Sequence, residues 1–211
     1  MIMAKTSRFC QYLIVFLIII CLSSCKKKES VYTIPEEFRA WSVFQPGSYW
    51  FYLNEQTQSI DSSYITGFSD QMRGVANDPH NIWYWENVNI DFTGSFLSHF
   101  EIMSTSNNFA SLYVNYRSGS SMALQLAYFN NYGLVHRETH LMGVVKVFSE
   151  FNVNGNTFTN VYQTRDSWSS GNGYADTVDF YFAKNIGIIK LEKHLAQTDT
   201  TWSVIRWHVV Q

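Results

Sequence analysis

The stretch VVKVFSEFNVNGNTFTNVYQTRD, residues 144–166, predicts the fold of this chain more clearly than any other. β-Branched and aromatic residues fill both of its halves, and these residue types are enriched in strands. Asn154-Gly155 separates the halves, and an Asn-Gly pair is the strongest short-range signal for a two-residue hairpin turn. We therefore predict two antiparallel strands joined at Asn154-Gly155.

Similar segments recur on both sides of this hairpin, separated by turn-forming residues. Short strands at such regular spacing are typical of an antiparallel meander. Residues 69–81 are polar and are expected to form a loop, and residues 34–41 are expected to form one helical turn that starts at Pro35. Residues 131–143 favour no assignment. The further predicted strands are residues 44–54, 59–68, 82–92, 96–105, 109–117, 122–130, 176–183, 186–194 and 200–210.

The alternation of side chains within these segments indicates how the sheet is buried. Strict alternation in TWSVIRWHV (201–209) places Arg206 and His208 on the same face as Trp202 and Val204. One wet face is the usual antiparallel pattern, but YWFYL (49–53) is apolar on both faces. We predict an all-β fold, an antiparallel curved sheet or incomplete barrel of about ten strands. A two-layer β-sandwich is the alternative.

The N-terminus carries a targeting signal. Lys5 and Arg8 precede an unbroken apolar run, residues 12–22. A membrane-spanning helix needs about 20 apolar residues, so this shorter run fits the hydrophobic region of a secretory signal. The alternatives are an uncleaved anchor helix or a plain signal peptide followed by a chance cysteine.

The sequence Leu22-Ser23-Ser24-Cys25 at the end of this run resembles the lipobox of bacterial lipoproteins. The resemblance implies that Ser24 is the last residue removed, that Cys25 is the lipidation site, and that acyl chains such as palmitate anchor the protein to a membrane. The expected organisation is a signal peptide over residues 1–24, a lipid-anchored tether over 25–40 and a single β-rich domain over 41–211.

Charge and cysteine usage exclude several classes of function. The formal net charge is −2, so the chain lacks the basic footprint of a nucleic-acid-binding protein. Cys10 and Cys21 would leave with the signal peptide and Cys25 would be acylated. The mature domain would then hold no thiol for nucleophilic, metal or redox chemistry.

Two stretches, FQPGSYWFYLNEQTQSIDSSYI (44–65) and DTVDFYFAKNIGIIKLEKH (176–194) with TWSVI (201–205), resemble pieces of β-rich lipoproteins from Bacteroidetes-type bacteria. That family brings no established activity. The resemblance implies a β-sheet lipoprotein of the cell envelope, lipid-anchored at the outer membrane, on either its periplasmic or its surface face. Half-barrel lipoprotein carriers are the nearest analogy for the fold.

The motifs that resemble catalytic or metal sites are weak. HRETH (136–140) has its glutamate one position away from that of the zinc-protease motif, and no nucleophile-elbow motif occurs. The carboxylate pairs Glu86 with Asp91 and Asp176 with Asp179 have no spacing that indicates catalysis. We predict no metal, no cofactor and no enzymatic activity, and a hydrolase is the less favoured hypothesis.

The remaining candidate binding residues are aromatic. Trp83 and Trp85, in the run WYW, would share one face of a strand and are candidate ligand-binding residues, while packing in the core is the alternative. We expect an envelope lipoprotein that binds an apolar or carbohydrate ligand on a concave, aromatic-rich sheet. The alternative is an accessory subunit that docks onto another envelope protein.

Overall fold

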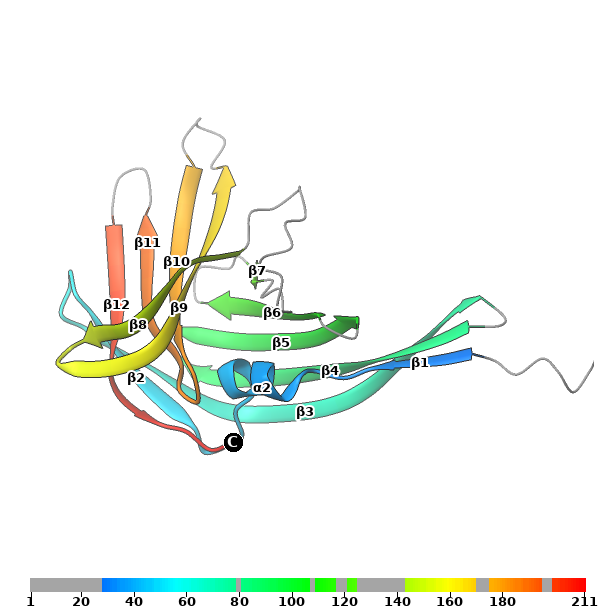
Figure 1. Cartoon of the computed structure of the whole chain (residues 1–211). Helices are drawn as coiled ribbons and strands as arrows, with labels where there is room; N and C mark the ends of the chain where they lie inside the picture. The colour runs from blue at the N-terminus through cyan, green and yellow to red at the C-terminus, as the bar shows by residue number, and fades with distance from the viewer. Residues whose placement is uncertain are drawn as a thin grey trace, which may run out of the picture. The chain divides into compact units, whose positions relative to one another are not determined.

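The structure, a computed structural model, describes residues 28–78, 81–106, 109–116, 121–124, 143–169, 175–194 and 199–211. Within these ranges the chain forms one helix and twelve strands (Figure 1). The helix is α2 (Glu36–Ser42), and no helix in the described ranges is long and apolar enough to cross a membrane. The strands are β1 (Lys28–Tyr32), β2 (Tyr49–Asn54), β3 (Ile60–Asp78), β4 (Asn81–Gly94), β5 (Leu97–Ser106), β6 (Phe109–Tyr116), β7 (Ser121–Leu124), β8 (Gly143–Val153), β9 (Asn156–Ser169), β10 (Ala175–Ala183), β11 (Gly187–His194) and β12 (Asp199–His208).

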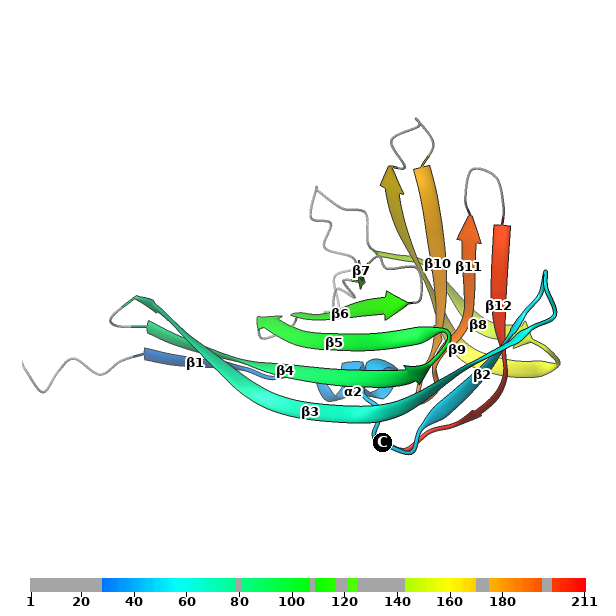
Figure 2. The ribbon, with the colours of Figure 1, turned by 180° about the vertical axis from the view of Figure 1, so that it is seen from behind.

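All twelve strands belong to one sheet, which confirms the predicted all-β antiparallel fold. Its order is β7-β6-β5-β4-β3-β2-β12-β11-β10-β9-β8, and β1 pairs with β4 outside this path. Consecutive strands are therefore neighbours from β2 to β7 and from β8 to β12, and β12 pairs with β2. β7 and β8 stand at the two ends of this order, so the strands that the structure describes form an open sheet. Both views show β5 and β6 running across the direction of β10–β12, as expected of a strongly curved sheet (Figures 1 and 2).

The described residues divide into two compact units, and residues 28–31, 74–78 and 81–84 belong to the first. Here the expected loop at residues 69–81 is wrong, because β3 continues to Asp78 and β4 begins at Asn81. A Cβ at Gly74 would lie 2.7 Å from the ring of Tyr84, so this glycine lets the ring lie against the backbone of β3. Backbone pairing with β4 holds this polar segment in a strand that its side chains alone do not predict.

The core of the second unit, residues 32–73 and 85–211, is one cluster of buried apolar side chains. Alternate residues of β2 supply it, as expected where one face of an antiparallel sheet is buried, whereas Phe180, Tyr181 and Phe182 of β10 are all buried. The largest side chains that are fully buried here are Trp50, Tyr52, Phe44, Phe100, Phe180, Phe182, Ile90, Ile102, Leu112, Ile188 and Ile189.

Helix α2 adds its apolar side to this core. Its segment buries Ile34, Phe38 and Trp41, and the Trp41 ring meets Tyr162 of β9 edge-on at 4.4 Å between centroids. Pro35 occupies the cap position that the sequence predicted. Ile34 and Phe38 are core residues although they lie within the expected tether, so the packed structure includes this part of the chain.

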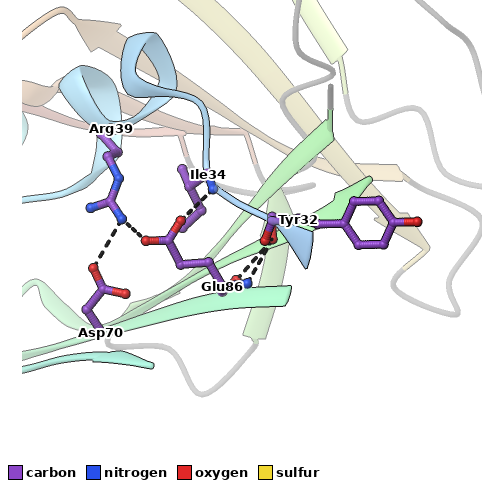
Figure 3. A network of polar contacts seen from close by, with 6 residues as sticks. Tyr32, Ile34, Arg39, Asp70 and Glu86 are labelled. Atoms are coloured by element: carbon purple, nitrogen blue, oxygen red, sulfur yellow. Dashed lines mark hydrogen bonds and ion pairs between the residues drawn. The ribbon is translucent and has the colours of Figure 1, made fainter. Parts of the chain in front are cut away.

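A polar network fastens the α2 segment to the sheet (Figure 3). Arg39 donates a hydrogen bond to Glu86 of β4 and another, of 3.1 Å, to Asp70 of β3. The Glu86 carboxylate also accepts the backbone N–H of Ile34 at 2.6 Å. A buried carboxylate with these partners is satisfied as an anion. Glu86 therefore has a structural role in this arrangement.

Candidate functional site

Strand β2 presents aromatic side chains on both faces of the sheet. Trp50 and Tyr52 point into the core, where the Trp50 indole N–H donates to the carbonyl of Ile186 at 2.7 Å and the Tyr52 hydroxyl donates to that of Ile188 at 2.9 Å. Tyr49 and Phe51 alternate with them and lie half-buried on the opposite, outward face. The outward pair is the starting point of the candidate site.

The neighbouring strand β3 adds a third outward ring. Tyr64 pairs with Tyr49 across the two strands, and its ring centroid lies 5.9 Å from that of Tyr49 and 5.7 Å from that of Phe51. Tyr49 and Phe51 are themselves 5.7 Å apart. Tyr64 is 39% exposed. Three aromatic rings in mutual contact thus face solvent on the side of the sheet that lies away from the core.

Strand β12 completes the site through an irregularity in its pairing. The register with β2 shifts between Val204 and Arg206, so Val204 lies opposite Tyr52 and Arg206 lies opposite Phe51. The strict alternation expected for residues 201–209 is therefore wrong after Val204. An extra residue in one strand moves the following side chains to the other face, and Arg206 and His208 point outward.

These two side chains pack beside the outward rings. The guanidinium carbon of Arg206 lies 5.8 Å from the ring centroid of Tyr49 and 5.9 Å from that of Phe51. The imidazole of His208 lies 5.6 Å from the Tyr49 ring, tilted by 30°. The distances of Arg206 allow cation–π attraction. We call Tyr49, Phe51, Tyr64, Arg206 and His208 the aromatic platform.

The platform is held by the middle of the sheet, since β2 lies between β3 and β12. Sites built on strands are more rigid than sites built on loops. Hydroxyl groups continue the outward face beyond Tyr64, where Thr66 of β3 lies within hydrogen-bonding distance of Thr93 of β4, at 3.2 Å. The site therefore combines fixed rings with polar groups at its border.

A polar cluster lies on the outward side chains of β9, β10 and β11. Asp179, which is buried, accepts two hydrogen bonds of 2.6 Å from Arg165 and one of 2.9 Å from Gln163. The hydroxyl of Tyr181 donates to Glu192 at 2.7 Å, and Lys190 pairs with the same carboxylate at 2.6 Å.

The pKa shifts in this cluster follow from its contacts. The hydrogen bond to Asp179 raises the pKa of Arg165, because it favours the charged guanidinium. Burial raises the pKa of the Tyr181 hydroxyl, and the hydrogen bond to Glu192 adds to the effect. Both shifts favour the protonated forms, which donate these hydrogen bonds.

The same cluster contains three possible metal ligands. Ligand atoms of Asp179, Glu192 and His194 lie within 4.8 Å of one another. Arg165 already holds the Asp179 carboxylate and Lys190 the Glu192 carboxylate, so a metal ion would have to displace two cations. The arrangement is that of a structural ion-pair network, and Asp179 is a member of it.

A groove of about 340 Å³ lies between α2 and the turn that joins β10 to β11. Its lining includes Glu36, Glu37, Arg39 and Lys184, so charges of both signs border it. Arg39 is already paired with Glu86 and Asp70. Because Arg39, its most enclosed cation, already pairs with two carboxylates, the groove is a weaker candidate binding site than the platform.

None of the described residues that the sequence predicted as site residues belongs to the platform. Trp83 is 43% exposed and belongs to the first unit, and Trp85 is half-buried in the second. Their role in ligand binding stays a prediction. Asp91, which the sequence offered only as a weak carboxylate candidate with Glu86, lies within hydrogen-bonding distance of His99, with 2.8 Å between its Oδ1 and the imidazole Nδ1. Ser24, Cys25 and the HRETH motif at residues 136–140 lie outside the described residues.

The platform residues were missed as a site, although one signal pointed to them. YWFYL is aromatic at both odd and even positions, which the sequence predicted to mean burial on both faces; in the structure Tyr49 and Phe51 are only half-buried. Comparisons with protein-family models, with curated proteins and with solved structures found no match to this chain. The geometry of the platform therefore carries the functional argument.

Proposed function

We propose that this protein is a lipid-anchored, non-enzymatic binding protein of the cell envelope, and that its aromatic platform binds carbohydrate. One observation carries the proposal: three rings in contact lie on the outward face, beside exposed hydrogen-bonding side chains. Large aromatic side chains normally pack in the core of a β-sheet. Three of them in contact on the solvent side therefore favour a binding role.

The chemistry of a sugar fits such a surface. One face of a pyranose ring consists of C–H groups that pack on an aromatic ring, and its hydroxyls turn to polar neighbours. Tyr49, Phe51 and Tyr64 supply the packing surface, and Arg206 and His208 supply N–H donors at its border. A saccharide can thus be bound without an enclosed pocket.

An apolar ligand fits less well, because such ligands are bound in cavities that bury most of their surface. The inward face of β2 offers no such space, since Trp50 and Tyr52 there are at most 2% exposed. The outward face is open and bordered by polar groups. Of the two ligand classes that the sequence left open, carbohydrate is therefore the one we propose.

A second candidate function, docking onto another envelope protein, has one observation in its favour. Ile60 of β3 is 60% exposed and lies opposite Leu53 of β2 in the register, next to the platform. Exposed apolar residues beside an aromatic cluster are common in protein interfaces. The carbohydrate test below separates the two functions.

The test is a glycan array probed with the full-length chain purified in detergent. We expect binding to a defined subset of saccharides, and the variant Y49S/F51S/Y64S should lose it. The matched control is V145S/V147S, which replaces two exposed apolar residues of β8 outside the platform and should bind as the natural protein does. Binding to no saccharide would contradict the proposal and leave protein docking.

The membrane anchor is tested separately. Acyl chains at Cys25 would hold the protein durably, since each buried CH₂ contributes about 0.8 kcal/mol. In cells fed an alkyne analogue of palmitate, the natural chain should take up label and C25S should not. C21S, with its cysteine in the signal, is the control that should still be labelled. Label on C25S would contradict Cys25 as the acylation site.

A further inference from the structure

Arg206 is the cation of the aromatic platform, and its close neighbours there are aromatic rings. Its guanidinium lies against the rings of Tyr49 and Phe51, and its side chain is exposed. Among the residues that the structure describes, it forms no ion pair. A guanidinium has five N–H donors, so an exposed one beside rings keeps donors for a partner in solvent.

Three acids on the outward face, among the residues that the structure describes, have partners other than Arg206. Glu55 accepts a hydrogen bond from Ser203, Glu192 is paired with Lys190, and Asp91 is paired with His99. Arg39 and Arg165, by contrast, each pair with carboxylates of this chain. The platform therefore presents a positive charge that the described part of the protein does not neutralise.

We infer that the saccharide bound by the platform is acidic, with a carboxylate or sulfate on the sugar that pairs with Arg206. This inference rests on the proposed function and names the ligand class. The fork of N–H groups in a guanidinium matches the two oxygens of a carboxylate or sulfate group. The rings would hold the C–H face of the sugar while Arg206 binds its acidic group.

The experiment uses ligand pairs that differ only in charge. Binding of the full-length chain to galacturonic acid oligomers is compared with binding to their methyl esters, and binding to chondroitin sulfate with binding to desulfated chondroitin. We expect the acidic member of at least one pair to bind tenfold or more tightly, the size typical of one charge-assisted hydrogen bond. This preference should shrink as salt rises, because the platform is exposed.

Two variants test whether Arg206 causes the preference for acidic ligands. R206Q should bring the affinity for the acidic ligand down to that for the neutral one. The matched control is K146Q, because Lys146 also lies over an aromatic ring, 4.5 Å from the centroid of Phe148, but outside the platform. It should leave the preference unchanged.

The outcomes separate the inference from the proposed function. Equal binding of acidic and neutral members, unchanged in R206Q, would overturn the inference and leave carbohydrate binding standing. A preference for acidic ligands that survives in R206Q would overturn the role of Arg206. Binding to neither member of either pair, nor to any glycan on the array, would overturn both.

Discussion

Both faces of β2 carry aromatic residues, but the residues of the two faces have different roles. Inward, Trp50 and Tyr52 are at most 2% exposed and donate hydrogen bonds to backbone carbonyls at the start of β11 and in the turn before it. Outward, Tyr49 and Phe51 are half-buried and contact other side chains, among them Arg206. Aromatic content alone therefore does not distinguish core from site, whereas burial and polar partners do.

We therefore expect the inward rings to stabilise the fold and the outward rings to bind ligand. A buried ring contributes through area removed from water and through packing that a smaller side chain cannot restore. A ring that stays half exposed contributes less to folding and remains available to a ligand. The four predictions below test this division from its largest expected effect to its smallest.

Trp50→Ala should cause the largest loss, about 3–5 kcal/mol of unfolding free energy, because it leaves a cavity beside Phe44 and Phe92 and an unpaired carbonyl at Ile186. Urea denaturation followed by circular dichroism measures it. A loss below about 1 kcal/mol would mean that the inward face is not the source of stability.

Glu86→Ala should cost about 2 kcal/mol, because it removes the acceptor of the Ile34 N–H and leaves Arg39 with Asp70 alone. Hydrogen exchange should rise at the α2 segment and stay unchanged in β11. Glu86→Gln, which keeps an acceptor oxygen, is the control and should cost less. Equal exchange rates at α2 in all three proteins would refute the role given to this network.

Tyr52→Phe should cost about 1 kcal/mol at pH 8, because the carbonyl of Ile188 loses its donor. Burial raises the pKa of the Tyr52 hydroxyl above its usual value of 10.0. The folded state therefore keeps a proton that the unfolded state releases, and stability should fall as the pH rises above about 10.

The same substitution removes that alkaline loss at position 52. Urea denaturation between pH 8 and pH 11 should show the natural protein losing stability faster than the variant. Tyr64→Phe, which changes an exposed tyrosine, is the control and should follow the natural protein. Parallel pH profiles for all three would contradict the assignment of a buried, protonated Tyr52.

The triple substitution Y49S/F51S/Y64S should have the smallest effect on folding for each residue changed, about 1 kcal/mol or less per ring, because these rings are only partly buried. Thermal denaturation checks this, and the chain should still unfold in one cooperative step. A loss per ring as large as that of Trp50→Ala would abolish the distinction between the two faces.

Local chemistry made several elements predictable. Asn154 and Gly155 have φ values of 49° and 79°, as the hairpin turn between β8 and β9 requires. The apolar alternation of β11 also matches its buried face. The extension of β3 to Asp78 was not predictable in this way, because pairing with β4 and not side-chain pattern maintains it.

The candidate site was harder to predict than the fold because of one extra residue in β12. The register shift next to Ile205 turns Arg206 and His208 to the outward face, opposite to the alternation that precedes it. A bulge leaves little trace in a β-rich sequence, since it depends on how the partner strand pairs. Without it, the outward rings of β2 have no visible cationic neighbour.

The central claim is that the outward rings bind ligand and do not maintain the fold. The most direct test is the affinity of Y49S/F51S/Y64S for the best saccharide of the array, measured by titration calorimetry on protein shown to be folded by circular dichroism. Our account predicts at least a tenfold loss, since interface aromatics commonly contribute more than 1.4 kcal/mol. Full affinity in the folded variant would contradict it.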